Sequence, residues 1–498
     1  MTALATRPAL RALALALASL CALELVYALA ANTVLWSGVI QRAVSGDGGN
    51  DLAWDRAYSP WPGRVYVKDL GLRVQDDEQQ FRLTIERAVV DVVLWELLRK
   101  QFRASRVRAE GVGFRYRRKV ERAAAQEPMV AAFPPLDGFA SPALLREPPK
   151  PLEHEPSMDE LLSRWSVRIE GVDATIAELW FQQYRYLGPA RVRGGFLLAP
   201  GRLVWVGPAL LELDGGALQA GDHALAPRFT ARAAVTFAPY DLAHNHGLQV
   251  FRALTGSVLL DAPLADLGAA DLHLNGLEVR GAGTLTARLD AAAGRLLPGS
   301  SLELHAPAVE VRRQGYRFTG EVLAKLWVEH GAPDLSARVT LGGALDVPSP
   351  ALTVALSGAV AELSLHDTDL SAGLTLLRLR AVLGEARVRD ARAITQLVSA
   401  KIPALAPLVL GDGPLVASLS AEVTPLDKTV RLLKAALGGA QLHGAAHAGP
   451  GGWRGAAAGH FAKVSFGLRL REGELDTSAL VGAGWLAREL AAAGLATD

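Results

Sequence analysis

Apolar and polar residues alternate with a period of two along most of the chain after residue 160. In residues 229–237 every second residue, from Phe229 to Phe237, is apolar. The same alternation is found at 165–170, 284–290, 337–341, 352–357, 361–366, 417–423 and 466–471. A period of two is typical of strands with one apolar and one wet face, as in antiparallel sheets. The pattern therefore predicts a mainly β protein built on an extended, twisted antiparallel sheet.

Glycine, proline and aspartate separate these stretches at short intervals, for example at Gly342-Gly343, and indicate turns. Few segments have helical character. Short or moderate helices are predicted at 95–101, 156–164, 390–402 and 477–495. In the third of these, Asp390 is a candidate N-cap, and Ile394, Leu397 and Val398 share one helical face.

The N-terminal 40 residues have a different pattern. From Ala12 to Trp36 the sequence is mostly apolar and Glu24 is its only charged residue, and it is long enough for the roughly 20 residues that cross a bilayer. Arg7 and Arg11 precede it and predict a cytoplasmic N-terminus, so the body is exported. We therefore expect residues 1–40 to form a single-pass signal anchor.

A cleaved signal peptide is the alternative. Ala28-Leu29-Ala30 has the small-x-small pattern of a cleavage site. Retention is favoured because the apolar stretch continues through Trp36, and Ala-rich sequence produces this pattern by chance. Both interpretations place the body outside the cytoplasm.

Residues 123–160 contain eight prolines, which cannot donate hydrogen bonds to a strand ladder. We expect a linker or long loop there. It separates a β–α unit at 51–122 from a longer β-sheet body with a C-terminal helix at 161–498.

Composition excludes several classes of protein. The 52 Lys and Arg residues nearly balance the 51 Asp and Glu residues, which argues against a general nucleic-acid binder. With 50% hydrophobic and 21% charged residues, the chain is not of the disordered class. Cys21 is the only cysteine and lies in the apolar segment, so the body forms no disulfide and no thiolate metal site.

No motif in the sequence indicates catalysis or a cofactor. His244-Asn245-His246 could hold a metal but is more typical of a solvated turn, and Asp367 and Asp369 fit an Asp-rich turn. Residues 482–487 match the dinucleotide-binding glycine pattern formally but lack a surrounding βαβ unit. We therefore expect a protein that is not an enzyme and binds no metal or cofactor.

The densest basic cluster lies near the N-terminal segment and admits two interpretations. Its members are Arg103, Arg106, Arg108, Arg115, Arg117, Arg118 and Lys119. They could meet anionic lipid headgroups, but the wet face of two strands explains them more simply. The aromatic pairs Trp54/Trp61 and Trp180/Phe181 are candidate interface anchors or core residues.

The stretch 51–119 is the most distinctive part of the chain. It runs from DLAWDRAYSPWPGRVYVKDLGLRV through FRLTIERAVVDVVLWELLRKQFRASRVRAEGVGFRYRR, with strand-like alternation on both sides of a short helix that ends in Leu-Leu-Arg. This stretch resembles the N-terminal unit of the AsmA-like superfamily, the envelope relatives of TamB and of chorein-type bridge-like lipid transfer proteins. Outside about 70 residues the likeness is one of pattern.

The resemblance implies a U-shaped β groove, lined by apolar side chains and rooted in the bacterial inner membrane, with the body in the periplasm. Phospholipid is then the expected ligand, and no catalytic residue is implied. The candidate groove-lining residues are Val65, Val67, Phe229, Val235, Phe237, Leu285, Leu289, Leu363, Leu365, Leu419, Phe466 and Leu468. The alternation alone favours a closed β core over a groove, and it is the resemblance of 51–119 that favours the groove. With a closed core the protein would be an anchored scaffold whose partners are other envelope proteins.

Overall fold

The computed structural model describes a mainly β chain that begins with a long helix. The residues it describes are 6–45, 50–76, 78–136, 138–139, 145–146, 157–241, 247–274, 276–329, 335–348, 351–366, 368–371, 375–388, 415–423, 428–437, 440–449, 452–461, 464–471, 474–479, 481–482 and 484–495. They form two compact units, residues 1–259 with 292–294, and residues 260–291 with 295–498.

The first unit contains the N-terminal helix and the strands up to β9. Its elements are α1 (Thr6–Trp36), α2 (Val39–Val44), β1 (Asp51–Ala53), β2 (Arg56–Trp61), β3 (Arg64–Gln75), β4 (Gln79–Val92), η1 (Leu94–Arg99), β5 (Gln101–Arg118), α3 (Pro128–Ala131), α4 (Met158–Ser163), β6 (Ser166–Phe181), β7 (Tyr184–Ala199), β8 (Leu203–Ala220), β9 (His223–Asp241) and η2 (Gly247–Ala253). Strand β10 (Leu254–Leu264) pairs with β9 and crosses the division between the units.

The second unit contains the remaining strands and a short C-terminal helix. Its elements are η3 (Leu267–Leu272), β11 (Glu278–Ala292), β12 (Arg295–Leu296), β13 (Ser301–Arg313), β14 (Tyr316–Val328), β15 (Leu335–Pro348), β16 (Ala351–His366), β17 (Thr375–Val388), β18 (Leu415–Val423), β19 (Lys428–Leu437), β20 (Ala440–Gly449), β21 (Gly452–Phe461), β22 (Val464–Arg471), β23 (Glu474–Ala479) and α6 (Trp485–Ala492).

The chain is mainly β, as predicted. From β3 onward most described strands pair with the next strand along the chain, and every described register but one is antiparallel. Strand β5 pairs with β6 in parallel, Gln101 opposite Ser166 and Tyr116 opposite Phe181. The sheet is therefore mixed rather than wholly antiparallel. A parallel pair needs a connection of a dozen or more residues to return the chain to the same end, and the Pro-rich segment has that length. The strands on either side of this segment lie in one compact unit.

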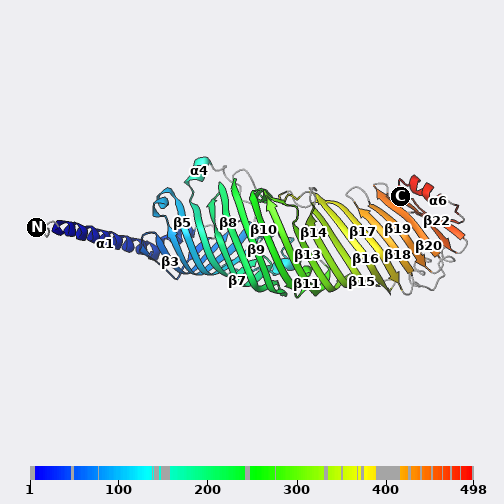
Figure 1. Cartoon of the computed structure of the whole chain (residues 1–498), viewed down its shortest axis with the longest axis horizontal. Helices are drawn as coiled ribbons and strands as arrows, with labels where there is room; N and C mark the ends of the chain where they lie inside the picture. Colours follow the sequence, from blue (N-terminus) through cyan, green and yellow to red (C-terminus); the bar gives the residue numbers. More distant parts are fainter. Residues whose placement is uncertain are drawn as a thin grey trace. The chain divides into compact units, whose positions relative to one another are not determined.

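Both ends of the chain are tied to strands. Strands β1 and β2 pair one after the other with the same edge of β3. The C-terminal part of α1 contacts β2, and the rest of the helix extends away from the sheet (Figure 1). Helix α1 is long and apolar enough to cross a membrane by length and composition. At the other terminus, α6 lies against β21 and β22.

The predicted short helices correspond to η1 and α4, whereas 390–402 lies outside the described residues. The C-terminal helix is shorter than predicted, because residues 474–479 form β23 and the helix begins at Trp485. Leu475 pairs with Leu470 and Thr477 with Leu468, so an Ala-rich sequence of good helix propensity is overridden at its start by pairing with β22.

Candidate functional site

The strands of the first unit align apolar residues in rows that cross from β3 to β9. One row consists of Val67, Ala88, Ala109, Ala174, Val192, Leu211 and Ala233. The next consists of Leu70, Ile85, Val112, Ile176, Ala190, Leu213 and Ala231. Side chains of neighbouring strands in one row point to the same side of a sheet. We call this side the apolar face of the first unit.

A shift in the alternation keeps these rows on one face. In β3 the apolar residues are odd-numbered up to Val67 and even-numbered from Leu70. Asp69 and Gly111, at the point of the shift in β3 and β5, adopt φ of 50° and 66°. Such residues re-aim the strand as β-bulges do. The φ of Gly111 is one that residues with a Cβ rarely adopt, and a Cβ there would also displace the Glu86 side chain in the strand between β3 and β5, so this point in β5 favours glycine.

The second unit has an apolar row of its own, which crosses from β11 to β22. By register its positions with described side chains are Leu285, Leu304, Ala324, Val339, Ala361, Ala381, Ala421, Ala446, Gly455 and Leu470. A parallel row consists of Ala287, Leu302, Leu326, Ala337, Leu363 and Leu379. These rows define the apolar face of the second unit.

Charged residues form rows on the opposite face of each unit. In the second unit, Lys325 bonds to Glu303 at 2.5 Å and Arg338 to Glu362 at 2.6 Å, each across one strand pair. In the first unit, Arg64 lies 2.7 Å from Asp91 and lowers the pKa of that carboxyl, chiefly through the hydrogen bond. Exposed pairs of this kind add little stability. Their consequence is a wet face that opposes the apolar one.

The structure places the twelve candidate groove residues on these two apolar faces. In the first unit, Val65 and Val67 alternate with polar neighbours in β3, and Phe229, Val235 and Phe237 share a side of β9 with Ala231 and Ala233. In the second unit, Leu285 and Leu363 belong to the rows themselves. The other five residues share the parity of row residues in their strands; they are Leu289, Leu365, Leu419, Phe466 and Leu468.

Two of the described segments pack on the charged, solvated faces of the sheet and do not cover the apolar rows. After β5, the loop around α3 is held by Arg117, whose Nη1 donates to the Pro134 carbonyl at 3.1 Å. Tyr116 has the same parity in β5 as Val112 of the apolar row, so the next residue, Arg117, lies on the opposite, charged face. At the C-terminus, Leu490 of α6 packs on Ala456, and Arg469 pairs with Glu489. Ala456 and Arg469 are opposite one another in β21 and β22, between the positions of the apolar row.

One segment packs on an apolar face. Leu267 and Ala270 of η3 contact a buried cluster of Val279, Ala306 and Val309. Ala306 has the parity of Leu304 in β13, which belongs to the apolar row. The apolar face of the second unit is therefore covered by η3 at one end of β11 and β13.

Polar side chains attach α1 to strand β2. The Tyr27 hydroxyl lies 2.8 Å from Ser59 Oγ and accepts a hydrogen bond from the Gly63 amide at 3.0 Å. The Asn32 side chain donates to the Ser59 carbonyl through Nδ2 and accepts from the Ser59 amide through Oδ1. Trp36 Nε1 donates to the Ala57 carbonyl at 2.9 Å. Ser59 is completely buried. The last third of α1 is thus fastened along β2 by hydrogen bonds from three side chains.

The basic cluster is only partly a solvated face. Arg117 is 1% exposed, which contradicts its expected place on the wet surface, and burial lowers its pKa. Its Nε donates to Gln80 Oε1 at 2.7 Å, so the buried charge is compensated by hydrogen bonds. Arg115 pairs with Glu178 at 2.8 Å.

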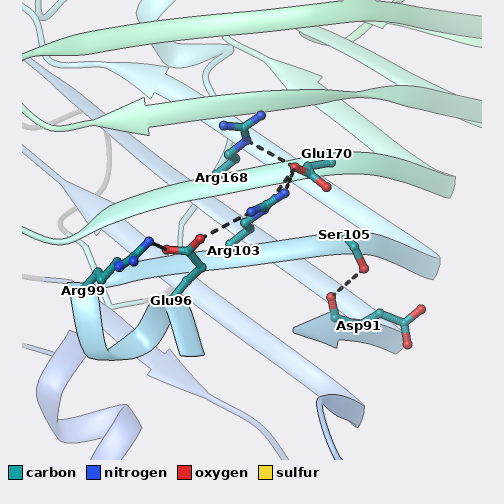
Figure 2. A network of polar contacts seen from close by, with 7 residues as sticks. All are labelled: Asp91, Glu96, Arg99, Arg103, Ser105, Arg168 and Glu170. Carbon is teal, nitrogen blue, oxygen red and sulfur yellow. Dashed lines mark hydrogen bonds and ion pairs between the residues drawn. The ribbon is translucent and has the colours of Figure 1, made fainter. Parts of the chain in front are cut away.

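Figure 2 shows the network around Arg103 in β5. Arg103 donates to Glu170 of β6 at 2.7 Å and to Glu96 of η1 at 3.4 Å. Arg99 and Arg168 approach the same two carboxylates, Glu96 at 3.7 Å and Glu170 at 3.4 Å. The pKa of Arg103 is raised, chiefly by its hydrogen bond to Glu170. The network fastens η1 to the first residues of β5 and β6.

The other candidates from the sequence lie partly within and partly outside the described residues. Among the described residues, no group of three or more His, Cys, Asp or Glu side chains is arranged to hold a metal ion. His244 and His246 lie outside the described residues, as does Asp367. Gly484 adopts φ 78° as the N-cap of α6, and Phe181 stacks on Tyr116 at 4.6 Å between ring centroids.

Sequence reasoning missed the attachment of α1 to β2. Tyr27 and Asn32 are polar residues in an apolar segment, which is the signal that could have indicated a partner there. Comparison of the chain with protein-family models, with curated proteins and with solved structures finds no match.

Proposed function

We propose that the protein is anchored by α1 in a bacterial inner membrane, holds its body in the periplasm and binds or conducts phospholipid along its apolar sheet faces. The observation that carries this proposal is the set of apolar rows, whose described side chains come from seven strands in the first unit and ten in the second. In this proposal the protein acts without catalysis, metal or cofactor.

The mechanism is a physical one. Each methylene group of an acyl chain that enters water costs about 0.8 kcal/mol, so an aqueous crossing by a whole chain has a high barrier. A surface of valine, leucine and alanine side chains lowers that barrier if the acyl chain stays against it. The charged rows on the other face support the proposal, because they keep that face wet and leave one apolar path per unit.

An anchored scaffold is the second candidate, and the packing of η3 favours it. Leu267 and Ala270 cover part of the apolar face of the second unit, as protein elements would in a closed β core. In that case the partners are other envelope proteins rather than lipid.

The test measures bound and transferred lipid with pairs of matched variants. Full-length protein is purified in detergent, bound phospholipid is quantified by mass spectrometry, and transfer between donor and acceptor vesicles is followed. Leu326→Glu and Leu323→Glu alter the same strand, β14, on the apolar and the opposite face respectively. Leu213→Glu and Leu210→Glu do the same in β8 of the first unit.

Lipid conduction predicts that Leu326→Glu and Leu213→Glu lower both bound lipid and transfer, whereas Leu323→Glu and Leu210→Glu preserve them. Equal effects from the two faces, or a wild-type protein with neither bound lipid nor transfer, would reject lipid handling. The scaffold would then be the better account.

A further inference from the structure

The short helix η1 has its apolar and charged side chains reversed relative to an ordinary surface turn. Its carboxylate residue, Glu96, is 5% exposed, whereas Trp95 is 52% and Leu98 89% exposed. A soluble surface normally places the charge outside and the large apolar groups inside. Burying Glu96 is tolerated because Arg103 and Arg99 pair with it. The same pairs fix η1 in the orientation that leaves Trp95 and Leu98 exposed.

Two segments next to η1 also carry exposed aromatic side chains. The β2–β3 turn is joined to the end of β4 by a hydrogen bond from the Val92 amide to the Gly63 carbonyl, and Trp61 beside it is 56% exposed. The start of β6 is joined to η1 by the Ser166 amide, which donates to the Lys100 carbonyl. Trp165, just before it, is 52% exposed. We call Trp61, Trp95, Leu98 and Trp165 the aromatic rim.

The length of helix α1 sets the distance between the cytoplasmic end of the helix and the aromatic rim. From Arg11 to Tyr27 the helix rises by 16 residues at about 1.5 Å each, or about 24 Å. The hydrocarbon core of a bilayer is about 30 Å thick. If Arg11 lies at the cytoplasmic boundary, Tyr27 lies within about 6 Å of the far boundary, next to the headgroup region. The Gly63 amide is bonded to the Tyr27 hydroxyl, so the β2–β3 turn is held at that depth.

We infer that the aromatic rim inserts into the headgroup region of the bilayer that α1 spans and is a second membrane contact of the body. Tryptophan is favoured at this depth because its ring is apolar and its N–H is polar. The cation of Arg99 lies 4.7 Å from the Trp95 ring centroid, which places a basic group beside the aromatic one as anionic headgroups require. This inference rests on the proposed anchoring by α1.

The consequence for the body is a defined orientation at the membrane. A single helix with a flexible joint would leave the sheet free to tilt, whereas the rim gives contacts at β2–β3, at η1 and at the start of β6. These are the strand ends of β3 to β6, so the strands of the first unit would begin or end at the bilayer surface. Lipid leaving the bilayer would then meet the strand ends of the apolar face directly.

The experiment measures the depth of single labels in full-length protein reconstituted into phosphatidylcholine–phosphatidylglycerol vesicles. Cys21→Ala removes the chain's one cysteine, and Leu98→Cys is then labelled with an environment-sensitive fluorophore. Phe181→Cys is the control, since Phe181 is also exposed, at 53% against 89% for Leu98, but lies at the opposite end of β6. Val26→Cys reports on α1 itself, where this side chain is exposed.

Insertion of the rim predicts a blue-shifted emission at position 98 and strong quenching by lipids with a spin label near the headgroup. The label at position 181 should show neither. Quenching at position 26 without quenching at 98 would overturn the rim while the anchor stands. Absence of quenching at both would overturn the anchor and the rim together.

A second variant guards against an effect of the label. Trp95→Gln combined with Leu98→Gln keeps the Glu96 contacts but removes the apolar surface. The doubly substituted protein should lose the difference in quenching between Trp165→Cys and Phe181→Cys. An unchanged difference would show that the rim does not insert through η1.

Discussion

The hydroxyl of Tyr27 in α1 lies 2.8 Å from the Oγ of Ser59 in β2. Ser59 in turn donates to the carbonyls of Trp61 and Arg64, so one buried hydroxyl joins the helix to both strands of the β2–β3 hairpin. The helix that would cross the membrane is therefore fastened rigidly to the edge of the sheet.

Tyr27→Phe should loosen this attachment. The substitution leaves the Gly63 amide without its acceptor and should cost about 1–3 kcal/mol of local stability, because an unsatisfied buried donor pays its desolvation. Hydrogen exchange of residues 59–64 should become faster in the detergent-solubilised protein. Tyr58→Phe is the control, since Tyr58 is 49% exposed and stacks on Tyr66. Equal exchange in the two variants would contradict the role of Tyr27.

Arg117→Met should release the loop around α3. The guanidinium is nearly fully buried and donates to Gln80 and to the Pro134 carbonyl. Methionine retains the apolar stem but leaves these acceptors unpaired. The free energy of unfolding measured with urea should therefore fall by about 2–3 kcal/mol. Proteolysis should also begin within residues 119–136. Arg118→Met, at the exposed neighbouring position, should change neither measurement.

Acid should detach α6 from the sheet. Arg469 lowers the pKa of Glu489, chiefly by a hydrogen bond, below the ordinary value of 4.5. A carboxyl whose pKa is lower in the folded state stabilises the fold above the unfolded pKa and loses that effect as pH falls through the folded one. The Tm of the wild-type protein should therefore fall below pH 4.5 more steeply than that of Glu489→Gln. Arg313→Gln, which removes an exposed arginine in β13 that does not act on Glu489, should keep the wild-type slope; identical slopes for all three proteins would rule out the pair.

Gly320→Ala should destabilise the second unit, whereas Gly342→Ala should not. A Cβ on Gly320 would overlap the carbonyl oxygen of Gly342 in the paired strand, but a Cβ on Gly342 meets no atom within 4 Å. Forcing β14 and β15 apart should cost about 1–3 kcal/mol, as overpacking does. Chemical denaturation of the two variants measures the difference. A similar loss in both would mean that the strands separate easily at this point.

Local alternation accounts for much of what could be predicted. Residues 229–237 and 361–366 have one apolar side each, and the structure places both in long strands with those sides in the apolar rows. The bulge at Asp69 and Gly111 also has a signal in the sequence, the shift from odd to even apolar positions. In each case the information lies within a few residues, because the side-chain period of a strand is a local property.

The sequence by itself determined that the chain is mainly β, that its strands have one apolar face and that it begins with an apolar helix of membrane-spanning length. Only the tertiary structure decided that β5 and β6 pair in parallel across the Pro-rich segment, that Arg117 is buried and that Tyr27 bonds to Ser59. The physical reason is separation along the chain. These contacts join residues that are tens of positions apart, and the preferences of single residues for strand, helix or solvent do not specify which distant partner satisfies them.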